Sequence, residues 1–93
     1  MKPKITITFH SDPKLGWGEV SREMVNQLGV ENKISGRSFE RGSKVYLEED
    51  IDLRLFILAA EADGYEIEWV ENMTNQPCFV RRLLAYSPRT YVC

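Results

Sequence analysis

The chain of 93 residues is long enough for one domain and too short for two, because two halves of this length could not each bury a hydrophobic core. Its 43% hydrophobic and 28% charged residues, with a net charge of −2, are typical of a packed globular protein and exclude a disordered tail. The longest apolar run, residues 55–60, is far below the roughly 20 residues that cross a bilayer, and no apolar signal-peptide stretch follows the first residues. We therefore expect a single domain over residues 1–93, cytoplasmic and not membrane-bound, with Cys78 and Cys93 reduced.

The first third of the chain predicts one strand and one short helix. Apolar and polar residues alternate over residues 5–10, which is typical of a half-buried strand. Residues 14–18 are expected to form a loop in which Trp17 packs over the edge of the core. Ser21 is the expected N-cap of a short helix that Gly29 ends.

The middle of the chain predicts a strand-helix-strand unit. Residues 31–43 have little periodicity and are expected to form an ordered loop or an irregular strand, whereas residues 44–48 alternate like a second strand. Asp50 is the expected N-cap of the following helix, which Gly64 ends. The buried stripe of that helix is expected at Leu53, Phe56, Ile57 and Ala60. A third strand is expected over residues 65–70.

The last part of the chain is ambiguous. Residues 78–86 could form a strand or one helical turn, and a strand is favoured. Together these elements predict an α+β fold. It is a small single-domain sheet of three to four strands with two helices, in the order β-α-β-α-β-β.

The acidic residues are concentrated in one segment. Residues 48–71 carry nine acidic side chains and one basic one, whereas the rest of the chain is net basic. The helix macrodipole would favour the acids at the start of the helix, and a solvated face would explain the others. Alternatively, the acidic side meets a basic surface on a partner, which would speed the encounter. The residues expected to bind that partner are Glu48, Glu49, Asp50, Asp52, Glu66, Glu68 and Glu71, with Trp17 or Tyr46 as an exposed aromatic anchor.

Basic residues gather with aromatic ones near the C-terminus, where arginines are interspersed with phenylalanine and tyrosine. Such a mixture can track phosphates and stack bases. The alternative function is therefore a small nucleic-acid-binding regulator. It would use Arg81, Arg82, Arg89 and Tyr86.

Catalytic, metal and cofactor motifs are all incomplete. His10 and Asp12 share a face of the first strand, but Ser11 points away and cannot complete a triad with them. Nothing in the sequence selects a dyad of Cys78 with His10. Zinc would need four ligands, the acids after residue 47 lack the spacing of a calcium loop, and no glycine cluster has the pattern of a nucleotide loop. We therefore expect no catalytic residue, no metal, no cofactor and no enzymatic activity.

Several short motifs between residues 9 and 63 form a recognisable pattern. They are Ser11-Asp12-Pro13, Gly16-Trp17, Leu28-Gly29, Ile34-Ser35, Arg41-Gly42 and Val45-Tyr46-Leu47-Glu48-Glu49-Asp50. In this pattern the chain resembles small proteins encoded by bacteriophages, prophages and plasmids. Those proteins often carry a histidine where this chain has Leu15 and a cysteine where it has Ile51. The resemblance thus implies a mobile genetic element in a bacterium and names no reaction.

Accessory proteins of such elements commonly bind a host protein, and this analogy sets the expected function. We expect an inhibitor of a host protein or complex, such as an anti-CRISPR or anti-restriction protein, that acts in the cytoplasm of the bacterial host. Its expected partner is a host protein or nucleoprotein complex with a basic surface. The sequence leaves the oligomeric state open.

Overall fold

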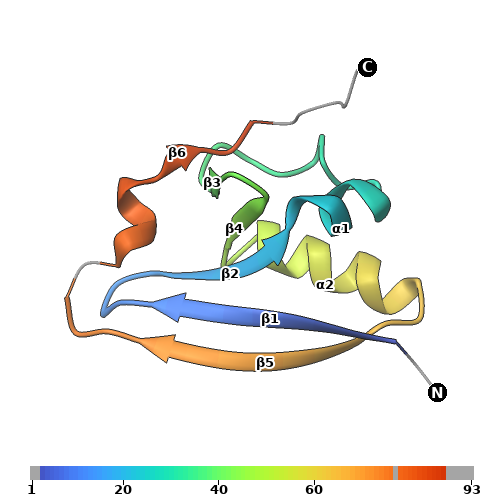
Figure 1. The fold of residues 1–93 in the computed structure, drawn as a ribbon, viewed down its shortest axis with the longest axis horizontal. Coiled ribbons are helices and arrows are strands. Elements are labelled where there is room, and N and C mark those ends of the chain that lie inside the picture. Colours follow the sequence, from blue (N-terminus) through green and yellow to red (C-terminus); the bar gives the residue numbers. More distant parts are fainter. Residues whose placement is uncertain (1–2, 77, 88–93) are drawn as a thin grey trace.

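Six strands form one mixed sheet in the order β5-β1-β2-β4-β3-β6, and two α-helices lie against one of its faces (Figure 1). The computed structural model describes residues 3–76 and 78–87. The elements in chain order are β1 (Lys4–Ser11), β2 (Gly16–Ser21), α1 (Arg22–Gln27), β3 (Phe39–Arg41), β4 (Lys44–Glu48), α2 (Asp52–Ala62), β5 (Glu66–Met73), the 3-10 helix η1 (Phe79–Arg82) and β6 (Leu84–Ala85). The predicted α+β class with two helices is confirmed.

All neighbouring strands run antiparallel except β1 and β5. β5 lies parallel to β1 over its whole length, from Glu66 beside Lys4 to Met73 beside Ser11. Because β2 is antiparallel to both β1 and β4, β4 points the same way as β5. α2 joins β4 to β5, so the predicted strand-helix-strand unit is present, with β1 and β2 between its two strands.

The main hydrophobic core lies between the helices and the sheet. The alternating side chains of β1, β2 and β4 that point toward the helices meet the apolar stripe of α2 there. The fully or nearly buried residues of this core include Ile7, Val20, Val25, Val45, Leu47, Leu53, Phe56 and Ala60. Gly18 lets α2 approach closely, because a Cβ atom at this position would lie 2.5 Å from Cδ1 of Leu53. The close packing of α2 on the sheet therefore requires a residue without a side chain at position 18.

A second, smaller apolar cluster lies on the opposite face of the sheet. Its buried members are Trp17, Tyr46, Cys78 and Val80. η1 brings the last two of these onto β2 and β4 from a distant part of the chain. Only part of this sheet face is covered in this way, and Thr6 and Lys44 on its other part remain exposed.

Most of the residues predicted to begin or end a helix do so in the structure. Ser21 caps α1, since its Oγ accepts a hydrogen bond from the backbone N–H of Met24 at 3.1 Å. Gly29 and Gly64 follow their helices with positive φ angles of 73° and 89°, a conformation that glycine adopts without strain. The prediction that Asp50 caps α2 is wrong, because the N-cap position belongs to Ile51.

The sheet has six strands instead of the three to four predicted, and the order of elements along the chain differs from the predicted β-α-β-α-β-β. Residues 16–18, expected in a loop, begin β2, because pairing with both β1 and β4 holds these glycine-rich residues extended. The stretch over 31–43 contains the short β3, and residues 78–86 form both η1 and β6 instead of a single strand. These short strands depend on partners far away in the sequence.

Candidate functional site

The nine carboxylates of residues 48–71 lie in separate places on the fold. Glu48, Glu49 and Asp50 end β4 and enter α2, and a second group, Glu61 and Asp63, lies where α2 ends. The third group is on β5 and consists of Glu66, Glu68 and Glu71. Three strand spacings separate β4 from β5, which is about 14 Å. This exceeds the Debye length of about 8 Å at physiological ionic strength, so the acids after β4 and those on β5 act as distinct patches.

Asp52 is not part of any acidic surface, which corrects the prediction from sequence. Its side chain is 1% exposed, and its Oδ2 accepts hydrogen bonds from three donors. These are the Ser35 N–H at 3.0 Å, the Ser35 hydroxyl at 2.7 Å and the Ser38 hydroxyl at 2.6 Å. Its position at the first turn of α2 adds the favourable field of the helix. The carboxylate therefore fixes the loop before β3 onto the start of α2.

Trp17 and Tyr46 are also buried, so the exposure predicted for both aromatic anchors is wrong. Their exposed fractions are 2% and 1%. Phe39 meets the Trp17 ring edge-on at 6.0 Å, and Phe79 meets the Tyr46 ring edge-on at 5.7 Å. Burial, followed by the negative charge of Glu19, raises the pKa of the Tyr46 hydroxyl. The cover comes from η1, whose position the local sequence around either residue does not reveal.

The acids between β4 and α2 share a hollow with basic groups. The hollow has a volume of about 470 Å³. It is lined by Leu15, Gly16, Trp17, Arg37, Phe39, Glu48, Glu49, Asp50 and Arg81. Glu48 is also engaged locally, because its Oε1 accepts a hydrogen bond from the N–H of Ile51 at 2.8 Å. This patch is consequently less negative than its sequence of three acids indicates.

The acids of β5 lie on an exposed strand at the end of the sheet. All three glutamates are exposed, and the ion pair of Glu68 with Lys4 is long, at 4.0 Å, between two exposed side chains. Such a pair contributes little to stability and leaves the carboxylate accessible. The same strand exposes Trp69 by 47%, and it exposes Met73 by 76%. β5 is therefore the element on which exposed acidic and apolar side chains coincide.

Sequence reasoning missed the exposed apolar residues of β5, namely Trp69, Val70 and Met73. The alternation over 65–70 places Trp69 on the same strand face as Tyr65 and Ile67, opposite Glu66 and Glu68, and gives no sign that this face is open. Trp69 does meet Phe9 edge-on, with ring centres 6.4 Å apart. However, only the strand order shows that β5 has no further strand beside it in the described part of the chain, which leaves Trp69 47% exposed.

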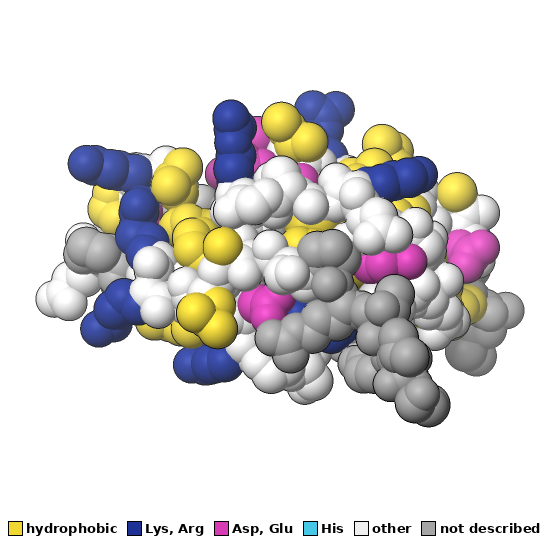
Figure 2. Space-filling view, turned by 90° about the horizontal axis from the view of Figure 1, so that it is seen from above, with side chains coloured by type: hydrophobic (Ala, Val, Ile, Leu, Met, Phe, Trp, Pro, Cys, Tyr) yellow, Lys and Arg dark blue, Asp and Glu magenta, His cyan; other side chains and the backbone are white. Residues whose placement is uncertain are grey.

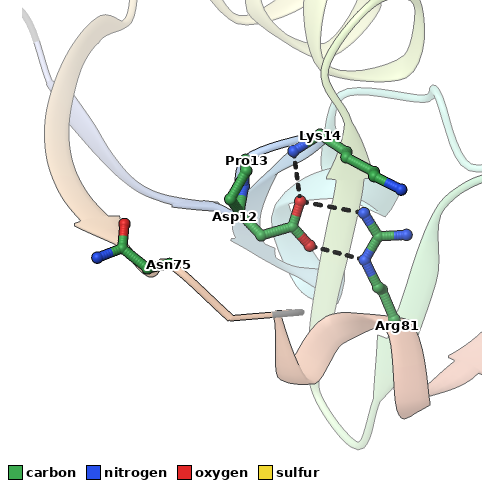
Figure 3. A pocket seen from close by; sticks show the side chains of 5 residues that line it. All are labelled: Asp12, Pro13, Lys14, Asn75 and Arg81. Atoms are coloured by element: carbon green, nitrogen blue, oxygen red, sulfur yellow. Dashed lines mark hydrogen bonds and ion pairs between the residues drawn. The ribbon is translucent and has the colours of Figure 1, made fainter.

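Arg81 is occupied within the protein. Its Nε–H donates to Oδ2 of Asp12 at 2.6 Å, and its Nη2 donates to Oδ1 at 3.0 Å (Figure 3). Its guanidinium also lies over the Trp17 ring. This arginine, and next the Cys78 N–H that donates to Oδ2, hold the pKa of the Asp12 carboxyl well below its usual range. Asp12 and Arg81 line an open hollow of about 330 Å³ together with Lys14 and Asn75.

The other residues of the nucleic-acid alternative are not assembled into one surface. Tyr86, expected to stack on bases, is buried, and its hydroxyl donates to the carbonyl oxygen of Glu31 at 2.7 Å. Arg82 is exposed, and Arg89 lies outside the described residues. On the face seen in Figure 2, basic side chains are interspersed with acidic and apolar ones. The structure thus brings together no set of free arginines with an exposed aromatic ring among the described residues.

His10 is buried between the two sheet-face aromatics Tyr46 and Phe79. Its Nε2 lies 2.8 Å from Oε1 of Glu19, and its Nδ1 lies 3.1 Å from Nδ2 of Asn72. Both ring nitrogens are therefore engaged, and neither of these two partners is Cys78. Within residues 3–76 and 78–87, no group of three His, Cys, Asp or Glu side chains is placed to hold a metal ion.

Comparisons with known proteins give no further indication of function. Among the described residues, no helix has the length and apolar character needed to cross a membrane. No family model matches the chain, and no curated protein or solved structure matches it significantly.

Proposed function

We propose that the chain is a binding protein of a mobile genetic element that inhibits a host protein or nucleoprotein complex, such as a CRISPR or restriction complex, by occupying a basic surface. The observation that carries this proposal is β5, which exposes three glutamates together with Trp69, Val70 and Met73. We assign the contact to this strand and not to the whole acidic segment, because the remaining acids are buried, dispersed or close to arginines.

The chemistry of β5 suits a protein interface. Exposed aromatic side chains are frequent centres of binding energy at interfaces, and Trp69, which shares one face of β5 with Glu71 and Met73, can form such a centre. The surrounding glutamates would steer a basic partner toward the strand and raise the rate of encounter. Trp69 and Met73 lie on one face of β5 with Glu71 between them, so exposed apolar side chains alternate with charge along this face.

Charge reversal on β5 tests the proposal. The variant carries Glu66→Lys, Glu68→Lys and Glu71→Lys, and the matched control carries Glu49→Lys, Glu61→Lys and Asp63→Lys, which are exposed elsewhere and change the net charge equally. A partner is first captured from host lysate and purified, and its association with each protein is then followed by surface plasmon resonance. We expect the β5 variant to associate at least about tenfold more slowly while the control stays near wild type.

A cellular measurement connects this binding to inhibition. Bacteria that carry the defence complex are challenged with phage while they express the wild type, the β5 variant or the control. The wild type and the control should restore plaque formation, and the β5 variant should not. Equal association rates and equal plaque formation for all three proteins would remove the proposal.

A further inference from the structure

β5 presents an unpaired edge along its whole length. It is the terminal strand of the sheet, and among residues 3–76 and 78–87 no element lies beyond it (Figure 1). Its pairing with β1 is continuous over eight positions, so no bulge turns this edge away from solvent. An edge of this kind offers backbone donors and acceptors to another extended chain.

The hydrogen bonds at both ends of β5 show which residues face outward. The N–H of Glu66 donates to the carbonyl oxygen of Pro3, and the N–H of Thr74 donates to that of Ser11, both at 2.9 Å. Backbone groups in a strand point alternately to its two sides, so the even-numbered residues of β5 face β1. The residues that direct their N–H and C=O groups to the free edge are therefore Ile67, Trp69, Glu71 and Met73.

The charge on β5 disfavours a second copy of this chain as the occupant of the edge. Proteins usually protect an exposed edge with lysine, proline, a bulge or a short strand, and β5 has only its glutamates. In an antiparallel pairing of two copies centred on Trp69, Glu68 of each would lie opposite Val70 and diagonally across from Glu68 of the other, and centring on Val70 would place the two Glu71 residues diagonally. Like charges at such diagonal positions, about 7–8 Å apart, repel each other, whereas a basic strand would neutralise them.

We propose that β5 receives an extended, basic segment of the partner protein, which adds to the sheet as a further strand. This inference rests on the proposed function and specifies how the partner docks. Backbone hydrogen bonds to the free edge would provide affinity, and alternate side chains would provide specificity. Basic residues on one face would meet Glu66 and Glu68, and apolar residues on the other would pack beside Trp69 and Met73.

The test uses a synthetic peptide of alternating lysine and valine residues, long enough to span β5. Glu71→Pro removes an outward N–H without touching the hydrogen bonds to β1, and Glu71→Ala is the matched control that loses the same charge and keeps the N–H. We expect calorimetry to show a loss of affinity for Glu71→Pro of at least about tenfold relative to Glu71→Ala. In the wild type, the peptide should slow amide hydrogen exchange at Ile67, Trp69 and Met73 by a similar factor.

The remaining outcomes separate this inference from the proposed function. If Glu68→Lys abolishes binding while Glu71→Pro binds like Glu71→Ala and no outward amide is protected, the acidic contact stands and strand addition is overturned. If Glu71→Pro loses binding while Glu68→Lys retains it, strand addition stands and the acidic basis of the proposed function fails. A wild type that does not bind the peptide overturns strand addition, and the exchange measurement decides the case in which Glu71→Pro does not fold.

Discussion

Asp12 shows how one carboxylate can organise a whole end of the molecule. Its Oδ1 accepts the N–H groups of Lys14 and Leu15, both at 2.9 Å, and so forms the turn between β1 and β2. Its Oδ2 accepts from Cys78 and Arg81, which positions η1 over the second cluster. The same residue therefore determines a local turn and a contact between distant parts of the chain.

Replacing Asp12 with asparagine should make the stability less dependent on pH. The pKa of Asp12 in the folded protein lies below its ordinary value of 3.8, so its charged form stabilises the fold above about pH 4, and this stabilisation is lost as the pH falls below that. Asp12→Asn should thus be less stable than the wild type at pH 7, and the difference should shrink at pH 3. Urea unfolding at both pH values measures it. The exposed Asp50→Asn is the control, and a difference that stays constant with pH would contradict the argument.

At the scale of elements, the sequence predicts those whose pattern is local. β1, β4, α2 and β5 each carry apolar residues at a regular spacing in the sequence, and this alternation or helical stripe is visible without knowledge of their neighbours. β2, β3 and β6 were missed or misplaced, because pairing across the sheet, and not their own composition, makes them strands. The predicted exposure of Tyr46 is wrong for the same reason. The alternation of β4 places Tyr46 on the face expected to meet solvent, but η1 covers it there.

The charged residues show a second limit of sequence interpretation. Residue type alone predicts that Asp52 lies on a surface with its acidic neighbours. In the structure, Ser35 and Ser38 supply the hydrogen-bond donors that make the burial of Asp52 favourable. Those serines lie 17 and 14 residues earlier in the chain. By contrast, the exposure of Glu66 and Glu68 followed from the alternation of their strand. The acidic part of the candidate site is therefore predictable from one element, whereas the exposure of Trp69 and Met73 depends on the strand order.

The packing of α2 on the sheet can be tested through Gly18. Gly18→Ala should cost about 1–3 kcal/mol, because the new Cβ would crowd Leu53 and Ile7. Leu53→Ala alone should cost about 2–5 kcal/mol by leaving a cavity. The double variant should cost less than both together, since the smaller side chain gives the new methyl group space.

Urea unfolding of the three proteins measures this coupling. Gly36→Ala serves as the control for glycine replacement, because no atom lies within 4 Å of its added Cβ and its φ is not positive. Its stability should stay within about 0.5 kcal/mol of the wild type. Strict additivity of Gly18→Ala and Leu53→Ala would mean that α2 moves away from the sheet instead of pressing on β2.

At the scale of the whole molecule, the fold protects most of its apolar surface and leaves one side open. α1 and α2 cover one face of the sheet, and η1 covers part of the other. β6, the terminal strand on one side of the sheet, has two residues and offers only a short edge. β5, the terminal strand on the other side, has eight residues. In the proposed mode of docking, the glutamates of β5 would have two compatible effects: they would repel a second copy of the chain and attract a basic partner.

Neutralising these glutamates should allow the chain to associate with itself. In a variant with Glu66→Gln, Glu68→Gln and Glu71→Gln, the free edge keeps its backbone groups and its exposed Trp69 and Met73 but loses the repulsion between copies. Sedimentation velocity should show dimers or larger species at concentrations where the wild type shows fewer, and added salt should shift the wild type in the same direction by screening the charges. The control variant, Glu49→Gln with Glu61→Gln and Asp63→Asn, changes the net charge equally and should sediment like the wild type. If both variants associate alike, net charge alone controls association; if neither does, the edge of β5 is not a pairing surface and the strand-addition argument loses its basis.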